Sequence, residues 1–224
     1  MPTSANVRMS YDKAKAILSS KGVNTNAAIL SQSFLRSELQ ATTTTTNYQF
    51  GLLVNQNPMG TTQFNTEQRL NINDVFVCNR VGIFVAKPSS ATDTTFSLDT
   101  YPVPSIYTTT NAASSLNTLY YNGKLNLILD NRNIVTAWDI RRHLVVPETQ
   151  SNTPPTGGVA AKDQKYLCDD GFYPIEPIWF VSGTSNVALN ITLPSAFTAV
   201  EANERIVVIL DGFLAQNATV VKSV

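Results

Sequence analysis

From residue 47 onward, apolar and polar residues follow the short runs and two-residue alternation that are typical of β-strands. VALNITL (187–193) alternates almost throughout, as expected for a strand with one face in water. Turn residues separate the blocks at Asn122-Gly123, 130–133 and 183–186. The pattern predicts strands at 47–55, 68–78, 80–88, 94–103, 116–121, 124–130, 133–146, 173–183, 186–194 and 205–217.

Residues 10–40 carry a helical pattern instead. SYDKAKAILSS places its apolar residues on one helical face, with Ser10 as the N-cap and Gly22 as the residue that ends the helix. A second helical segment is expected at 25–40, where apolar residues recur at i,i+4 spacing. We expect this arm to pack under a sheet, and the alternatives are a partner protein or a membrane surface.

No helical pattern separates the later strands, which argues against parallel βαβ units. The predicted fold class is therefore all-β, an antiparallel jelly-roll sandwich or barrel. The expected division is an N-terminal helical arm at 1–40 and a β region at 41–224. Two irregular segments, 55–67 and 147–164, are interpreted as loops.

Charge is sparse and balanced, with 16 Lys and Arg against 16 Asp and Glu, and only 14% charged residues compared with roughly 25% in an average protein. The basic stripe that grips nucleic acid is not present, so direct nucleic-acid binding is not expected. A weakly charged chain of zero net charge also self-associates more readily. The sequence shows neither a signal-peptide pattern nor an apolar run long enough for a membrane span.

The two cysteines, Cys78 and Cys168, are expected to be free thiols, and a disulfide between them is the alternative. No Cys/His cluster suggests zinc, and no cofactor is expected. Asp169 and Asp170 are a weak Ca²⁺ candidate, because they lack the regular ligand spacing of a calcium loop.

No catalytic residue is assigned, and the chain is not expected to be an enzyme. His143 is the single histidine, and no GxSxG motif accompanies it, so it is interpreted as a strand residue or a surface contact. Paired carboxylates for a hydrolase are the weakest hypothesis. The candidates are Asp139, Asp169, Asp170, Glu176, Glu201 and Glu204.

Four aromatic residues could form a sugar-binding platform, although core packing is the favoured interpretation. They are Tyr120, Tyr121, Trp138 and Trp179. Pro174 and Pro177 begin a strand pattern, which is typical of a sheet edge.

The stretch RIVVILDGFLAQN (205–217) fits either a strand delivering a catalytic acid or a structural strand. Because no helices separate the strands, we interpret Ile206–Leu210 as a central strand buried on both faces. Asp211-Gly212 is then expected to be a turn or a bulge, with glycine supplying a positive φ.

The pattern of the whole chain resembles one family. The resemblance rests on the helical arm, on the strand-only remainder and on the segments KLNLILDNRNIV and ERIVVILDGFLAQN. This family is the jelly-roll major capsid proteins of tailless icosahedral bacteriophages with an internal membrane. The resemblance implies two fused jelly rolls, trimeric capsomers and a location in the virion, after synthesis in the host cytoplasm. Its expected partners are other copies, other virion proteins and an internal membrane reached by the arm.

The double form is expected to be a minimal version, with a first barrel at about 41–146 and a second at about 165–224, with strand exchange allowed. Sixteen strands of about five residues fit this length only tightly, and a single jelly roll is the alternative. Functional alternatives are a minor virion protein (vertex, spike or auxiliary capsid) or a carbohydrate-binding β-sandwich.

Overall fold

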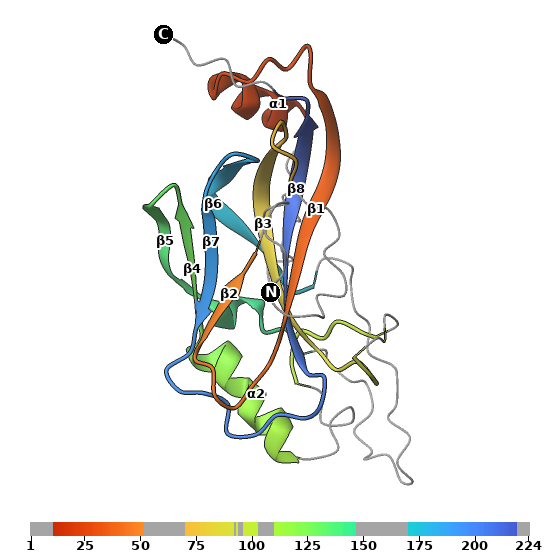
Figure 1. Cartoon of the computed structure of the whole chain (residues 1–224), viewed down its shortest axis with the longest axis vertical. Coiled ribbons are helices and arrows are strands. Elements are labelled where there is room, and N and C mark those ends of the chain that lie inside the picture. Colours follow the sequence, from red (N-terminus) through yellow and green to blue (C-terminus); the bar gives the residue numbers. More distant parts are fainter. Residues whose placement is uncertain are drawn as a thin grey trace.

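The computed structural model describes residues 11–51, 70–91, 93, 96–102, 110–146 and 170–218. These residues form two antiparallel four-stranded sheets packed face to face (Figure 1). The strands are β1 (Ile29–Gln40), β2 (Asn47–Phe50), β3 (Val75–Ala86), β4 (Lys124–Leu129), β5 (Arg132–Asp139), β6 (Phe172–Ser182), β7 (Val187–Thr192) and β8 (Arg205–Gln216). The helices are α1 (Tyr11–Ser20), α2 (Thr110–Asn122) and the short 3-10 helix η1 (Ile140–His143).

The strand order follows a simple rule across both sheets. The first sheet has the order β1-β8-β3-β6 and the second has the order β2-β7-β4-β5. Strand β1 therefore pairs with β8, β2 with β7, β3 with β6, and β4 with β5. This is the order obtained when one long antiparallel hairpin rolls up into a sandwich. The ladder between β3 and β8 joins two of these pairs into the first sheet, and the ladder between β4 and β7 joins the other two into the second.

The two central strands of the first sheet, β3 and β8, are covered on both faces. All twelve residues of β3 are buried, because the main core lies on one side and smaller apolar clusters lie on the other. The register of β3 against β8 shifts between Cys78 and Arg80, which leaves Asn79 as an extra, bulged residue. The bulge reverses the alternation: Phe76 faces the core before it, and Val81 faces the core after it.

The second sheet has short strands with one covered face. Strands β4 and β7 alternate between buried and partly exposed positions, as the sequence pattern predicted. Asp130 and Asn131 have φ of 48° and 62° and form the two-residue turn between β4 and β5. This tight turn was also predicted, although the strongest turn motif, Asn122-Gly123, instead lies where α2 ends and β4 begins.

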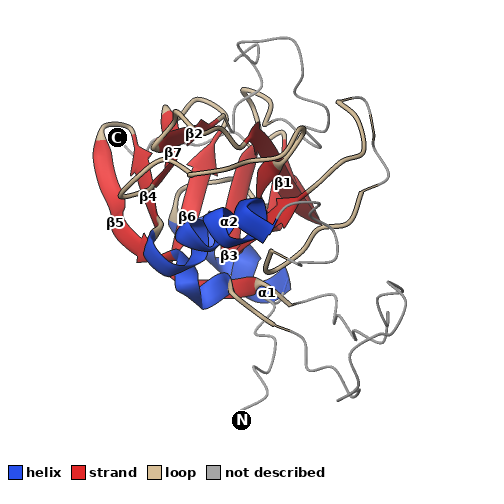
Figure 2. Cartoon of the chain, turned by 90° about the horizontal axis from the view of Figure 1, so that it is seen from below, coloured by secondary structure: helices blue, strands red, loops and turns tan. Residues whose placement is uncertain are grey.

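The two α-helices cover two different surfaces of the sandwich. Helix α2 lies across its lower end (Figure 2), where Leu116, Leu119 and Tyr120 join the main core. Helix α1 packs outside the first sheet, with Leu18 in one apolar cluster with Val77. It ends where expected, since Gly22 has φ of 78° and its N–H donates to the carbonyl of Ser19.

Several predictions about elements were wrong. The segment expected to be helical at 25–40 instead contains β1 from Ile29 onward, which pairs with β8 along its whole length. The strand expected at 116–121 lies in α2. The strand expected at 94–103 forms only the bridge between Asp99 and Val85 among its described residues.

The described residues form one sandwich of eight strands with one principal core, so the sixteen strands expected for two barrels at 41–146 and 165–224 are not found among them. The physical reason is strand length: β1, β3 and β8 each run for 12 residues. Within the described ranges, no helix has the length and apolar character that a membrane crossing needs.

Candidate functional site

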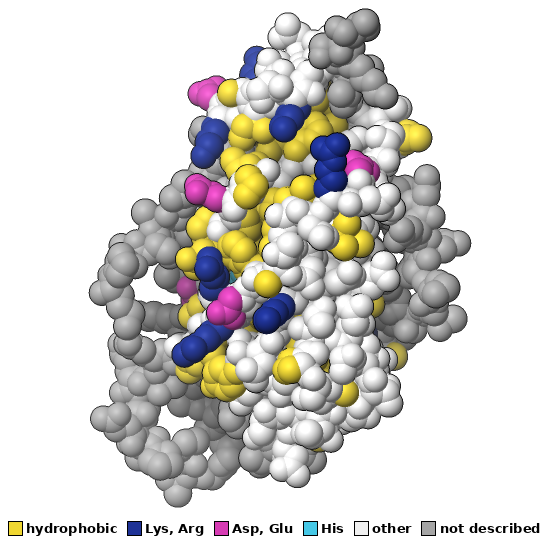
Figure 3. All heavy atoms as spheres, turned by 90° about the vertical axis from the view of Figure 1, so that its left-hand side faces the viewer, with side chains coloured by type: hydrophobic (Ala, Val, Ile, Leu, Met, Phe, Trp, Pro, Cys, Tyr) yellow, Lys and Arg dark blue, Asp and Glu magenta, His cyan; other side chains and the backbone are white. Residues whose placement is uncertain are grey.

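An open, largely apolar groove lies between β5 and β6, the edge strands on one side of the two sheets. Its volume is about 580 Å³, and Figure 3 shows apolar side chains running along this face between charged ones. Ile134 lines it from β5, and Pro177, Ile178 and Trp179 line it from β6. Apolar surface of this kind on a weakly charged protein is typical of an interaction site.

Both edges of the groove are irregular. The β4–β5 ladder is interrupted twice, with one extra residue on β5 each time. The β3–β6 ladder is interrupted between Pro174 and Trp179. The prediction that Pro174 and Pro177 mark a sheet edge is therefore confirmed.

Trp179 forms part of the groove and is 1% exposed. Its indole nitrogen Nε1 is buried and has no hydrogen-bond partner among the described residues. A buried indole N–H normally finds an acceptor. Because Trp179 belongs to the main core, this nitrogen is an unsatisfied donor inside the fold.

His143 has a structural position, since it is fully buried in η1 and is neither a strand residue nor a surface contact. Its Nε2 accepts a hydrogen bond of 2.9 Å from the indole N–H of Trp138. Its Nδ1–H therefore donates to the carbonyl of Gly171 at 2.8 Å. Burial lowers the pKa of His143 to about 4, so the ring is neutral at physiological pH.

Arg142 packs over two aromatic rings, one on β5 and one on β6. Its guanidinium carbon lies 4.7 Å from the ring centroid of Trp138 and 5.3 Å from that of Tyr173. Asp139 caps η1, accepting a hydrogen bond of 3.0 Å from the backbone N–H of Arg141. These contacts bridge β5 and β6 and fix Trp138 and Tyr173 in place.

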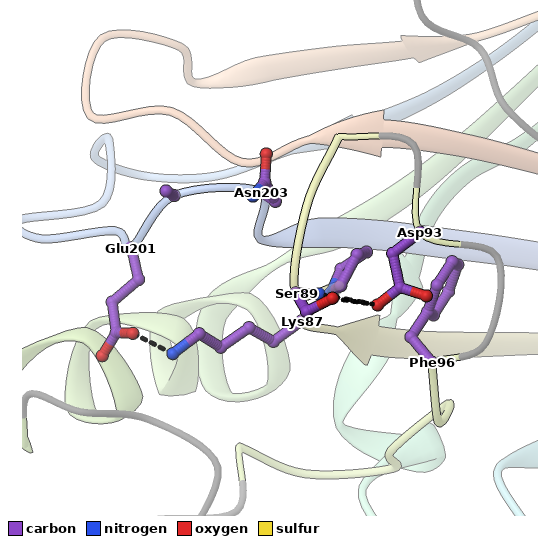
Figure 4. A pocket seen from close by; sticks show the side chains of 8 residues that line it. Lys87, Ser89, Asp93, Phe96, Glu201 and Asn203 are labelled. Carbon is purple, nitrogen blue, oxygen red and sulfur yellow. Dashed lines mark hydrogen bonds and ion pairs between the residues drawn. The ribbon is translucent and has the colours of Figure 1, made fainter.

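A second hollow, of about 520 Å³, lies where β3 ends and β8 begins (Figure 4). Lys87 extends toward Glu201, with which it forms an ion pair. Ser89 donates a hydrogen bond of 2.6 Å to Asp93. The charges that line this hollow are thus already engaged with one another.

Glu204 lies next to this hollow and is fully buried. Neither of its carboxylate oxygens has a hydrogen-bond partner in the described part of the chain. Burial raises the pKa of Glu204 to about 7; the Glu201 backbone and the Lys87 ammonium oppose the shift, and the Glu201 carboxylate adds to it. The structure therefore places two of the candidate carboxylates, Glu201 and Glu204, near each other.

Asp211, the acidic residue of RIVVILDGFLAQN, has a structural role. Asp211 lies inside β8 and forms a buried ion pair with Arg80, whose Nε donates to it at 2.9 Å. The expected turn at Asp211-Gly212 is wrong, because the strand is continuous and the bulge belongs to Asn79 on β3. Gly212 is needed for a close approach, since a Cβ there would lie 2.0 Å from the carbonyl oxygen of Val77.

The remaining candidates are spread over the molecule. Tyr120 and Trp179 are core residues, as the favoured interpretation predicted, whereas Tyr121 is exposed on α2. Asp170 is half-buried in the turn before β6, while Asp169 and Cys168 lie outside the described residues.

Across the described ranges, no group of three or more His, Cys, Asp or Glu residues is placed to hold a metal. Cys78 is a buried free thiol, and burial raises its pKa well above the usual range. The sequence showed the types of these residues but not the groove, which forms from two strands that are distant along the chain.

No protein-family model matches the chain, and no curated protein or solved structure is significantly similar to it.

Proposed function

We propose that this chain is a virion structural protein, a single jelly roll that assembles with copies of itself into an icosahedral shell. The observation that carries the proposal is the strand pairing β1–β8, β2–β7, β3–β6 and β4–β5. A hairpin rolled in this way gives two Greek keys in two sheets, which is the jelly-roll arrangement. Jelly rolls recur in viral capsids, lectins and cupins.

The side chains favour the capsid function over the other two. Cupin-type metal chemistry draws on histidine ligands, but the ring nitrogens of His143 are both engaged within the fold. Sugar binding by stacking needs exposed aromatic rings, but of the four candidate rings Tyr120 and Trp179 are buried, Trp138 is half-buried and only Tyr121 is exposed. A carbohydrate-binding sandwich is therefore the weaker alternative.

Self-association is supported by surface chemistry. The chain has 14% charged residues and a net charge of zero, and apolar side chains line an open groove at one side of the sandwich. Interfaces are depleted of charge at their centre and enriched in aromatic residues. Trimeric capsomers, contacts with other virion proteins and an N-terminal contact with an internal membrane remain predictions.

Size measurement tests the proposal. The purified full chain is passed through size exclusion with light scattering over a hundredfold range of concentration. We expect species of at least three copies that grow with concentration. A protein that stays monomeric throughout and binds sugars on a glycan array would contradict the proposal and favour the carbohydrate-binding alternative.

A further inference from the structure

We propose that the groove between β5 and β6 binds a second copy of this chain, with the β5 side of one copy against the β6 side of the other. This inference rests on the proposed function and identifies one contact that the shell would use. Icosahedral symmetry contains two-fold axes as well as three-fold axes, and the same surface of both copies meets across a two-fold axis. Such a surface has to be complementary to itself.

The centre of the groove has the composition of an interface core. Leu129, Ile134 and Ile178 line it, and Ile134 is 37% exposed. Covering these side chains removes apolar surface from water, which favours association.

The strand edges determine how a partner can be held. Prolines and bulges protect an edge against pairing with another strand. Strand β5 carries two extra residues relative to β4, and β6 carries Pro174 and Pro177. We therefore expect side-chain packing across the groove and no continuous sheet between copies.

Charge identifies the partner as a second copy. Arg132 is exposed on the β5 side of the groove, and Glu176 is exposed on the β6 side, directly before the groove residue Pro177. A two-fold axis parallel to the groove places each β5 side against the β6 side of the other copy. Arg132 of each copy then faces Glu176 of the other, so that two ion pairs border one apolar contact.

Charge reversal tests this arrangement in the full-length protein. Arg132→Glu and Glu176→Arg each place like charges together, and each is expected to weaken self-association about tenfold or more. Sedimentation velocity measures the association, and the melting temperature verifies that each variant is folded. Lys15→Glu makes the same charge change as Arg132→Glu at an exposed position on α1 outside the groove, and it is expected to leave association unchanged.

Two combinations make the test specific to the pairing of these residues. The double variant R132E/E176R restores both ion pairs with their signs exchanged, so its association should recover. An equimolar mixture of the two single variants should also recover, because in a mixed pair every substituted side chain meets an opposite charge. Single variants that weaken association without recovery in either combination would overturn the proposed pairing.

Failure of the contact can be separated from failure of the proposed function. If the wild type assembles and neither single variant changes this, the groove is not the contact, but self-assembly stands. If the groove variants lose binding to a different protein while the oligomeric state is unchanged, a second copy is the wrong occupant. If the wild type is monomeric, both proposals fall.

Discussion

The two sheets differ in what covers them, although they pack face to face in one sandwich. In the first sheet, β3 and β8 have apolar clusters on both faces. In the second, β4 and β7 bury only alternate residues. A charged group on these doubly covered strands needs a partner inside the protein, as Arg80 of β3 has in Asp211 of β8. Removing a single polar partner should therefore lower the free energy of unfolding strongly in the first sheet and only slightly in the second.

The largest expected effect follows from separating the buried ion pair. Arg80→Ala leaves Asp211 buried without its partner, and we expect the free energy of unfolding to fall by about 3–5 kcal/mol. The matched variant in the second sheet, Lys124→Ala, removes an exposed cation on β4 and should cost less than about 1 kcal/mol. Urea denaturation measures both, and equal losses would show that coverage does not distinguish the sheets.

The second-largest effect on stability is expected at Glu204, just before β8. Its carboxyl is buried and has no hydrogen-bond partner among the described residues. Its folded pKa of about 7 lies above the ordinary value of 4.5. The folded state therefore holds its proton more tightly, and stability should decrease by about 2–3 kcal/mol as the pH rises from 4.5 to 7. Glu204→Gln should remove this decrease, whereas Asp12→Asn on the exposed side of α1 should not. A wild type without the decrease would place the Glu204 side chain in water.

His143 should respond to pH in the opposite direction. Its folded pKa of about 4 lies below the ordinary 6.5, so the unfolded state binds the proton more tightly. The stability it contributes is complete above pH 6.5 and is lost as the pH falls toward 4, by about 2–3 kcal/mol. The chain has one histidine, so a proton NMR titration reports it without assignment. A midpoint near 6.5 would contradict its burial between the sheets.

A smaller effect is expected from the close approach of β8 to β3. Gly212→Ala places a methyl group against the backbone carbonyl of Val77, which cannot move as a side chain would. We expect a loss of about 1–3 kcal/mol in the free energy of unfolding. The melting temperature measures it, and an unchanged value would mean that the strands separate without cost at this point.

The contrast between the sheets also explains what the sequence could predict. Alternation in VALNITL identified β7, and the uninterrupted apolar run in RIVVIL identified a central strand. In both cases the order of apolar and polar residues along the strand shows directly which of its faces are buried. The segment at 29–40 was taken for helix because Leu30, Phe34 and Leu35 also fit helical spacing. Only pairing with β8 decides between the two, and that is a contact between residues far apart in the chain.

The same reason limits prediction of the sites. Asp211 looked like a turn residue, since its partner Arg80 is 131 positions away. The break in the pattern at Asn79 was interpreted as a gap between two strands, but it is a bulge within one. The groove could not be predicted, because it depends on β5 and β6 lying on the same side of the two sheets.

Electron microscopy of the concentrated, purified chain is the most direct test of whether this sandwich forms a shell. We expect closed shells or symmetric capsomers in the wild type. We also expect their loss in Arg132→Glu and their return in R132E/E176R. A uniform field of single 24.4 kDa particles in the wild type would contradict it.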